Sequence, residues 1–336
     1  MRSLAIVVPK AKGEEVRKKL LESENLRKDL IVRRDEEHLY FPVLKGVDLG
    51  FEMRDMDFEE GGVAVRSYLD LVKVPHQLRS LLPTSFDIVG EIAVIKIPEE
   101  LKEYSSAIGE AILGANKSVR TVVSDEGVVG DFRIRNIRVI AGKEDTRTTH
   151  REFGLMFAVD LKRAYFSPRL ATERQRIVQK VKPGELIIDM FCGVGPFSVA
   201  ISKNVPGTRI FGMDSNPYAI KNFMENIRMN KVENVVPMEG DVMDLMKSME
   251  PADRIIMDLP QKAIEYFVLA LSAIKNGGTI HYYEILTEVE ARERESMLNA
   301  IGLEHGRRIM IEERRIVRGY SPSQNHYAFD IKVSWS

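Results

Sequence analysis

The C-terminal half of the chain consists of short apolar runs separated by amphipathic, helix-compatible stretches. Such alternation is typical of a doubly wound sheet with mostly parallel strands. Asn216 and Pro217 support this pattern, because a capping residue followed by proline starts a helix after the second run. The predicted strands are 186–189, 209–213, 235–240, 254–260 with its following loop, and 277–283, then a helix at 288–300 and late strands at 308–312 and 328–335.

A small α/β unit is expected at the N-terminus, over residues 1–62. Its predicted elements are a strand at 4–8, a charged helix at 13–21 and a strand at 38–42. The acids of 55–60 and the pair Gly61-Gly62 predict a linker. Residues 63–81 have helical periodicity that ends before Leu82-Pro83, and we assign 63–85 to the connection between units.

A second α+β unit is expected over residues 86–168. Phe86–Pro98 is typical of two strands joined by a turn and closed by proline, and 99–113 has helical periodicity. Residues 132–140 alternate apolar and basic side chains, which predicts a strand with one face in a core and arginines on the other. A further strand is expected at 153–159. The remaining residues, 169–336, form the third unit.

The turn after the first strand of the third unit carries the strongest chemical signal. Asp189 ends that strand, and Gly193 and Gly195 follow, so a ligand can approach the backbone closely. Asp214 ends the next strand, where an acid can accept from both hydroxyls of a ribose. Asp241 follows the third strand, where it could accept from an exocyclic amine. Together these positions predict a pocket for an adenosine-containing cofactor.

The details of the turn favour a cofactor without phosphate. Ser198 stands where a dinucleotide site has its third glycine, and no Lys-Ser or Lys-Thr pair follows as in a P-loop. The pattern Asp189-x-Phe-x-Gly193-x-Gly195-Pro196 resembles the first motif of S-adenosylmethionine methyltransferases. The resemblance implies an α/β fold, a Rossmann-like class I methyltransferase sheet. An ordinary strand-turn-helix corner with chance acids is the alternative.

Composition narrows the function classes without choosing among them. The chain has 336 residues, 44% of them hydrophobic, and no apolar run approaches the length that spans a bilayer. The single cysteine, Cys192, excludes an intramolecular disulfide and a zinc site built on several cysteines. We therefore expect a cytoplasmic protein with no membrane partner.

Charge is balanced overall but uneven along the chain. The net charge is −1, yet residues 133–182 contain thirteen Lys or Arg against five Asp or Glu. A local excess of eight positive charges beside the cofactor motif is what binding to a phosphate backbone would need. A solvated charged surface is the alternative.

Two further segments could bear on the reaction. Asp258-Leu259-Pro260 ends the fourth strand, at the sheet edge where ligands bind, and should face a transferred methyl group. Glu173 lies just upstream of the cofactor motif. Thr172 could cap a helix that begins there, and Glu173 would then lie in its first turn, where a negative charge is favoured. Alternatively, a carboxylate there could take the proton from a ring nitrogen that is being methylated. An arginine could stabilise charge that develops on a neighbouring oxygen.

These residues resemble the archaeal and eukaryotic tRNA (guanine-37-N1)-methyltransferases over essentially the whole chain. The segments Tyr165–Arg169 and Ile280–Tyr283 are the most specific. The other segments that carry the resemblance are Gly130–Arg135, Thr149–Gly154, Val159-Asp160, Glu173-Arg174, Asp189–Phe197 and Arg315–Pro322.

The resemblance implies a methyl transfer from S-adenosylmethionine to N1 of guanine 37, beside the anticodon. It implies that Glu173 is the general base, that Arg133 contacts O6, and that Tyr165 and Pro260 line the pocket of a flipped-out guanine. It implies an N-terminal domain on the tRNA elbow and two domains on the anticodon stem-loop. Arg135, Arg169 and Arg318 are further expected substrate contacts. The expected cofactor contacts are Asp189, Phe191, Gly193, Gly195, Pro196, Asp214, Asp241 and Asp258.

One position departs from the family pattern. The family usually has Asn-Leu-Pro where this chain has Asp258, and a carboxylate accepts hydrogen bonds but cannot donate as the amide does. Asp258 could therefore share the base role with Glu173.

Three alternatives stay open at this point. A wyosine-pathway enzyme would transfer an aminocarboxypropyl group or a methyl group to a modified guanine at the same tRNA position. A non-enzymatic RNA-binding protein and a small-molecule methyltransferase are the others. We expect a monomer. We also expect no metal site, because His150, His281 and His326 are widely scattered.

Overall fold

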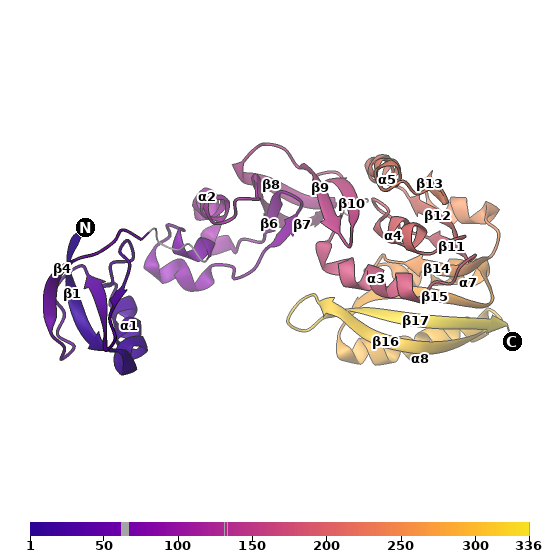
Figure 1. Ribbon diagram of the computed structural model, residues 1–336. Coiled ribbons are helices and arrows are strands. Elements are labelled where there is room, and N and C mark those ends of the chain that lie inside the picture. The colour runs from indigo at the N-terminus through magenta and orange to yellow at the C-terminus, as the bar shows by residue number, and fades with distance from the viewer. Residues whose placement is uncertain (62–66, 131, 133, 336) are drawn as a thin grey trace. The chain divides into compact units, whose positions relative to one another are not determined.

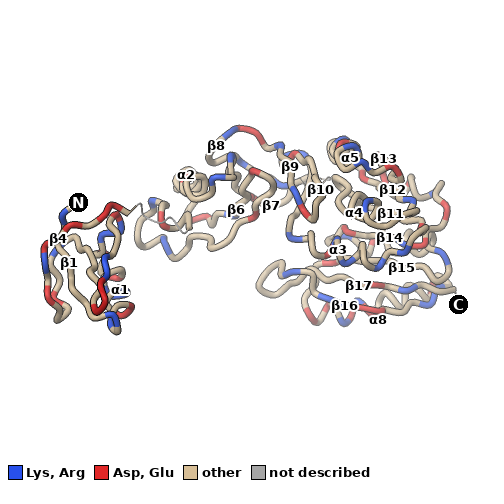
Figure 2. Tube along the Cα trace, in the orientation of Figure 1, with Lys and Arg blue, Asp and Glu red and all other residues tan. Residues whose placement is uncertain are grey.

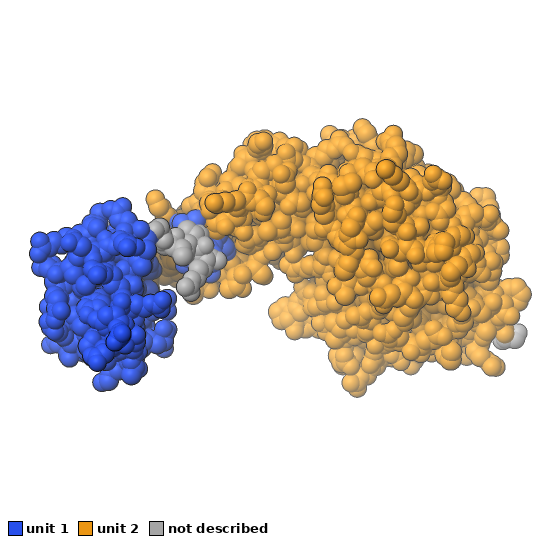
Figure 3. All heavy atoms as spheres, viewed as in Figure 1, with its two compact units in different colours: residues 1–71 blue, residues 72–336 orange. Residues whose placement is uncertain are grey.

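The computed structural model describes residues 1–61, 67–130, 132 and 134–335 (Figure 1). The chain divides into two compact units, residues 1–71 and 72–336, which Figure 3 colours separately. The predicted boundary at 62–63 lies outside the described residues. No helix of the described chain combines the length and the apolar character that crossing a membrane requires.

The first unit is one antiparallel sheet covered by a helix. The strand order is β2-β3-β1-β4, and Val16 and Leu20 of the helix pack on Ile6 and Phe41 of the sheet. The predicted strands at 4–8 and 38–42 and the helix at 13–21 are confirmed. The elements are β1 (Arg2–Pro9), α1 (Gly13–Glu22), β2 (Arg33–Arg34), β3 (His38–Val43) and β4 (Met53–Asp57).

Two predictions around the boundary of this unit were wrong. The acids expected in a linker at 55–60 partly belong to β4, which pairs with β1 at the edge of the sheet and leaves Asp55 and Asp57 exposed. The helix expected over 63–81 is replaced, where described, by 3₁₀ turns at Tyr68–Asp70 and His76–Leu81. Pro75 separates these turns, because proline lacks the N–H that a continuous helix needs.

The second unit begins with a four-stranded sheet in the order β5-β6-β7-β8. The predicted pair of strands and the following helix are confirmed, and the helix packs on the sheet with no room for a side chain at Gly109. The sequence prediction missed β7, although 121–123 is a β-branched run. The elements are β5 (Asp87–Val89), β6 (Ile92–Ile95), a 3₁₀ turn (Glu99–Tyr104), α2 (Ser105–Ala115), β7 (Thr121–Val129) and β8 (Ile134–Gly142).

A hairpin of β9 (Arg147–Glu152) and β10 (Leu155–Asp160) follows. The free edge of β10 is completed by two asparagines of α5 (Pro217–Asn230). Asn230 accepts from the Met156 N–H at 2.9 Å and donates to its carbonyl at 2.7 Å, and Asn226 bonds Ala158 in the same way at 2.7 and 3.2 Å. The hairpin is therefore fixed to α5 by side-chain amides that make the hydrogen bonds a neighbouring strand would make.

The C-terminal part is the predicted doubly wound sheet, in the order β13-β12-β11-β14-β15-β17-β16. The first five strands run parallel, and β17 and β16 are antiparallel to their neighbours. The late strands are longer than predicted. The elements are α3 (Ala171–Lys180), β11 (Leu186–Asp189), α4 (Pro196–Asn204), β12 (Arg209–Asp214), β13 (Val235–Glu239), α6 (Val242–Leu245), β14 (Ala252–Met257), α7 (Phe267–Ala273), β15 (Ile274–Leu286), α8 (Glu288–Glu304), β16 (Arg307–Gly319) and β17 (Asn325–Trp335).

Helices cover both faces of this sheet (Figure 1). On one face Ile177 of α3, Val199 of α4 and Phe223 of α5 share a core that continues into the hairpin and the four-stranded sheet. On the other face α7 and α8 bury a second core that includes Leu271 and Leu298. The predicted cap of α5 is confirmed, since the Asn216 side chain accepts from the Tyr218 N–H.

A buried ion pair joins α3 to the hairpin. The Arg174 guanidinium donates to both carboxylate oxygens of Glu152, at 2.6 and 2.5 Å, and to the Ser167 carbonyl at 3.2 Å. The guanidinium carbon of Arg174 lies 5.3 Å from the centre of the Phe166 ring. Both side chains are at most 6% exposed, so each charge depends on the other for compensation.

We expect Glu152→Gln to destabilise the second unit by about 3 to 5 kcal/mol, because it leaves the Arg174 charge buried and unpaired. Asp87→Asn is the control, since its partner Arg169 is half exposed and such pairs contribute less than about 1 kcal/mol. Urea denaturation measures both. Equal losses would show that burial of the Arg174 pair does not set its contribution.

We expect Gly195→Ala to destabilise the fold more than Gly154→Ala does. Both glycines have φ +78, so an added methyl group is strained at either position, but at Gly195 it would also clash with the Phe223 ring, whereas at Gly154 it would meet open space. The clash should add about 1 to 3 kcal/mol. Thermal unfolding of the two variants tests this, and identical melting temperatures would contradict it.

Candidate active site

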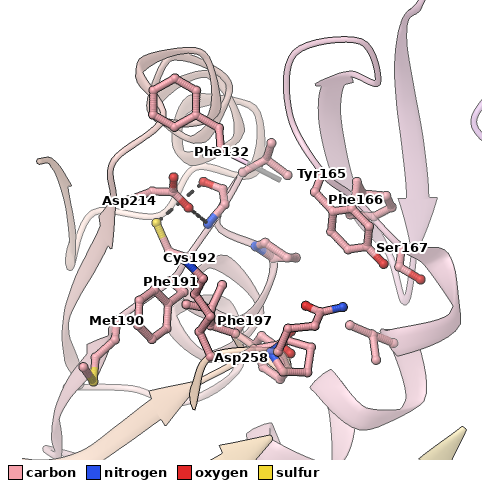
Figure 4. A pocket seen from close by; sticks show the side chains of 18 of the residues that line it. Phe132, Tyr165, Phe166, Ser167, Met190, Phe191, Cys192, Phe197, Asp214 and Asp258 are labelled. Atoms are coloured by element: carbon pink, nitrogen blue, oxygen red, sulfur yellow. Dashed lines mark hydrogen bonds between the residues drawn. The ribbon is translucent and has the colours of Figure 1, made fainter. Parts of the chain in front are cut away.

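A pocket lies beyond the carboxyl ends of β11, β12, β13 and β14, where the sequence places it (Figure 4). Asp214 and Phe191 lie on one side, and Tyr165 and Ser167 lie across the pocket from them. The predicted site residues that line it are Tyr165, Phe191, Gly193, Pro196, Asp214, Asp241, Asp258, Pro260 and Arg318.

The glycine turn and Asp214 hold each other in place. The Gly193 N–H donates to one carboxylate oxygen of Asp214 at 2.8 Å, and the Asn216 N–H donates to the other at 2.9 Å. Gly193 has φ +55 and lies at the pocket wall with no side chain. Burial raises the pKa of Asp214. Each carboxylate oxygen retains acceptor capacity, so the fixed carboxylate can still take ribose hydroxyls.

Asp241 starts the helix α6 and also lines the pocket. One of its oxygens accepts from the Met243 N–H at 2.8 Å, as an N-cap does. The other oxygen has no partner among the described residues, and it could accept from a ligand amine. Nearby, the rings of Phe191 and Tyr266 meet edge to face at 5.0 Å and form an apolar wall.

Asp189 and Gly195 lie behind the turn and do not line the pocket. Asp189 is buried and accepts from the Ser198 hydroxyl at 2.8 Å, and burial raises its pKa to about 7. Gly195 is the N-cap of α4, in the left-handed region, with Pro196 at the first position of the helix. The two residues fix the conformation of the turn without lining the pocket.

The predicted arginines have different surroundings. Arg318 lines the pocket. Arg135 forms an ion pair with Asp125 and lies 5.1 Å from the centre of the Tyr165 ring, so it supports the pocket wall from outside. Arg169 pairs with Asp87 at 2.6 Å, away from the pocket. Arg133 lies outside the described residues.

The helix that bears Glu173 begins differently from the prediction. It starts at Ala171, Leu170 is the N-cap, and no side chain caps it, so the predicted Thr172 cap was wrong. A 3₁₀ turn at Pro168–Leu170 runs directly into the helix, and the Ala171 N–H bonds the Pro168 carbonyl instead. Glu173 does lie in the first turn, as expected.

Glu173 is buried and fully bonded, and it does not line the pocket. The Tyr283 hydroxyl donates to it at 2.8 Å, Arg176 at 2.6 to 3.1 Å and Arg315 at 2.9 Å. Arg176 also bonds Asp330 of β17. Glu173 therefore lies in a buried ionic network next to the pocket.

Asp258 has the opposite surroundings. It lines the pocket, its Oδ1 lies 3.7 Å from Nε2 of His326, and burial raises its pKa to about 6 against the positive charges of Arg174 and Arg318.

The sequence analysis gave no role in the pocket to two polar residues that line it. His326 and Ser167 are each 2% exposed, and neither the His326 ring nitrogens nor the Ser167 hydroxyl has a partner within the described chain. Burial and Arg318 lower the pKa of His326 to about 4. Only strand register could have revealed His326, which lies opposite Ile285 near the end of β15.

Much of the basic block is neutralised by acids far away in the sequence. Arg147 pairs with Glu225 and Lys180 with Asp330, besides the pairs already described. Figure 2 shows Lys and Arg beside Asp and Glu along the hairpin and α3. Among the described residues of the block, those that are exposed and carry no ion pair are Lys143, Arg151, Lys162 and Lys182.

No group of three or more His, Cys, Asp or Glu side chains within the described residues is arranged to hold a metal ion. The residues around the Gly193 turn could hold a cofactor. Their carboxylate acceptors and aromatic rings suit a nucleoside.

Three sequence models of known domains match the chain in succession. The tRNA methyltransferase 5 N-terminal domain matches residues 5–52, and the TYW2 N-terminal domain matches residues 65–146. The TRM5/TYW2 methyltransferase domain matches residues 148–310.

Individual proteins match along the whole chain. The tRNA (guanine(37)-N(1))-methyltransferase Trm5b of Pyrococcus abyssi is 42% identical over 99% of this chain and 100% of its own length, and its crystal structure aligns with a TM-score of 0.76. A structure of aTrm5 with tRNALeu is 31% identical, covers 98% of this chain and 99% of its own, and has a TM-score of 0.72. Trm5 of Methanocaldococcus jannaschii in complex with adenosine is 30% identical, covers 99% and 100%, and has a TM-score of 0.67. With its sequence related from end to end and its fold shared, the chain belongs to the Trm5 family of tRNA methyltransferases.

Proposed function

We propose that the chain transfers the methyl group of S-adenosylmethionine to N1 of guanine 37 in tRNA, giving 1-methylguanosine. The observation that carries the proposal is one pocket with two chemically different sides. Phe191 and Asp214 at the glycine turn lie on one side, Tyr165 and Ser167 lie across from them, and Asp241 and Asp258 also line the pocket. The Pyrococcus abyssi relative that bears this activity in its name matches the chain over its full length.

The cofactor would lie on the turn side. Asp214, fixed by two N–H donors, takes the ribose hydroxyls, and the free oxygen of Asp241 accepts from the adenine amine. The rings of Phe191 and Tyr266 offer the apolar wall against the base. S-adenosylmethionine, when bound, supplies an electrophilic methyl group on its sulfonium. Gly193 and Pro196 contact it, and Asp189 and Gly195 act through the shape of the turn.

The guanine would lie on the side of Tyr165 and Pro260. A base inside a stem-loop cannot reach this pocket unless it is turned out of its stack. Tyr165 offers an aromatic face, and Arg135 behind it holds the ring. Arg318 offers a donor to the base or its phosphate. Arg133 is proposed, from the family resemblance alone, as the donor to O6.

Removal of the N1 proton requires an acceptor. Glu173 is the carboxylate that the family resemblance implies, and Asp258 is a carboxylate that lines the pocket itself. Their surroundings differ strongly, because Glu173 is bonded within a buried network and Asp258 lines the pocket.

The binding regions on tRNA are part of the proposal. Residues 1–62 would contact the elbow, and residues 86–168 with 169–336 would hold the anticodon stem-loop, with 63–85 between them. Exposed basic residues without an ion pair, such as Arg151 and Lys162, would meet phosphates. Arg169 would do so after exchanging Asp87 for a phosphate. We propose a monomer that acts in the cytoplasm.

A wyosine-pathway reaction at the same tRNA position is the second candidate. The match of residues 65–146 to the TYW2 N-terminal domain favours it. Transfer of an aminocarboxypropyl group requires no acceptor for an N1 proton. The full-length match to Trm5b favours methyl transfer.

The first test is transfer of labelled methyl from S-adenosylmethionine to unmodified tRNA transcripts with guanine or adenine at position 37. We expect label in the guanine transcript alone, recovered as 1-methylguanosine, and an affinity for tRNA that falls steeply with salt. Reaction only with a tRNA that carries a wyosine precursor would favour the second candidate. Cofactor turnover without any tRNA reaction would overturn both.

Asp214→Ala should weaken binding of S-adenosylmethionine by about 10- to 100-fold, because two charge-assisted hydrogen bonds to the ribose are lost. Asp244→Ala is the matched control, since Asp244 is exposed, pairs with Lys247 and is not among the residues that line the pocket. Calorimetric titration gives both affinities. Unchanged affinity in a folded Asp214→Ala protein would move the ribose contact to another residue.

A further inference from the structure

The acceptor positions of the Glu173 carboxylate are all occupied by donors of the protein itself. Oε1 accepts from the Tyr283 hydroxyl at 2.8 Å and from Nη2 of Arg176 at 2.6 Å. Oε2 accepts from Nε of Arg176 at 3.0 Å and from Arg315 at 2.9 Å. A carboxylate offers about four acceptor positions, so Glu173 can accept from a substrate only when one of these donors leaves.

The three donors differ in how firmly they are held. Tyr283 is fully buried and belongs to the core that α3 shares with the sheet. The Arg176 side chain is 13% exposed and also bonds Asp330, at 2.5 and 3.1 Å. The Arg315 side chain is 33% exposed and makes no other hydrogen bond or ion pair with the residues that the structure describes. Arg315 is therefore the donor that an incoming anion can most easily take from Glu173.

Arg315 lies on the strand that leads to the open end of the pocket. β16 continues from it to Arg318, and the chain then reaches Tyr320, and both of these residues line the pocket. Tyr320 is 49% exposed, so the pocket reaches the protein surface here. A nucleotide that places its base in the pocket brings its phosphates to this surface, where a guanidinium can bind a phosphate through two parallel hydrogen bonds.

We propose that Arg315 holds the Glu173 carboxylate while no RNA is bound and moves to a phosphate of the RNA when the substrate binds. This inference rests on the proposed function and explains how its general base becomes available. Glu173 stands between Leu170 and Arg174, which both line the pocket, so its side chain can turn to the guanine once Oε2 is released. The N1–H bond then breaks, its proton passes to Oε2, and its electron pair stays on the ring nitrogen for methylation.

The exchange leaves no charge uncompensated. Removing one partner of a buried ion pair is costly when the other charge stays unpaired. Glu173 keeps Arg176 as its ionic partner and gains the N1–H donor of the base, and Arg315 gains a phosphate. Neither replacement is available before the RNA arrives, so the carboxylate stays closed to proton transfer until the substrate is in place.

The first test separates binding from chemistry in the full chain, with an unmodified tRNA transcript that has guanine at position 37. Arg315→Gln should weaken tRNA binding by about 3- to 10-fold and lower the salt slope of the affinity by about one, because one phosphate contact is lost. The loss should appear in kcat/KM and not in the rate constant at saturating tRNA and S-adenosylmethionine, because bound RNA has already displaced Arg315 in the natural chain. Arg308→Gln is the matched control, since Arg308 is exposed at the other end of the same strand.

The second test measures the exchange of partners itself, through tRNA affinity alone. Glu173→Gln removes the charge that holds Arg315, so we expect this variant to bind tRNA more tightly than the natural chain, by about 3-fold or more. The gain should vanish in the double variant with Arg315→Gln, because no guanidinium is left to move. Thermal unfolding shows whether each variant is folded.

Each measurement can overturn the inference. A fall in the saturating rate of Arg315→Gln would show that Arg315 supports the base during the reaction, and unchanged tRNA affinity would show that it meets no phosphate. The inference also fails if Glu173→Gln binds tRNA no more tightly than the natural chain, or if its gain persists without Arg315. Absence of methyl transfer to guanine 37 would instead overturn the proposed function, while the affinities would still decide whether Arg315 exchanges its partner.

Discussion

The buried ion pair between Arg174 and Glu152 is the interaction on which the active-site architecture depends. It joins the first turn of α3 to the last residue of β9, and it brings a hairpin of one sheet against the helix layer of another. The burial of this pair is tolerable because the guanidinium also bonds the Ser167 carbonyl and lies over the Phe166 ring. Tyr165 and Ser167, which form one wall of the pocket, are therefore held by the same contact that holds the two layers.

Three neighbouring charged residues of helix α3 form hydrogen bonds to three different strands. Glu173 faces Tyr283 of β15, Arg174 faces Glu152 of β9, and Arg176 faces Asp330 of β17. Asp330 in turn accepts from His281 and Lys180. The burial of so many charges is tolerable only because each meets an opposite charge at hydrogen-bond distance. The Glu173 carboxylate is held in a fixed position within this network.

The sequence predicted best where a pattern is local. The apolar runs and the cap at Asn216 predicted the parallel strands and α5, and the three acids at strand ends predicted one edge of the sheet. Periodicity failed over 63–81, where Pro75 interrupts it, and the hydrophobic pattern did not mark β9, which reads polar because it is an edge strand. Pairing across the sheet cannot be read from spacing, so the unpartnered His326 and the enclosed position of Glu173 were out of reach.

The asparagines that complete β10 have a consequence for how this region folds. An edge strand with free N–H and C=O groups invites pairing with a strand of another chain, and Asn226 and Asn230 occupy those groups at Met156 and Ala158. Asn226 also donates to the Val194 carbonyl of the glycine turn. The hairpin cannot detach without exposing α5 and loosening that turn. Protection against aggregation and cooperative unfolding of the hairpin with the cofactor loop thus follow from the same two amides.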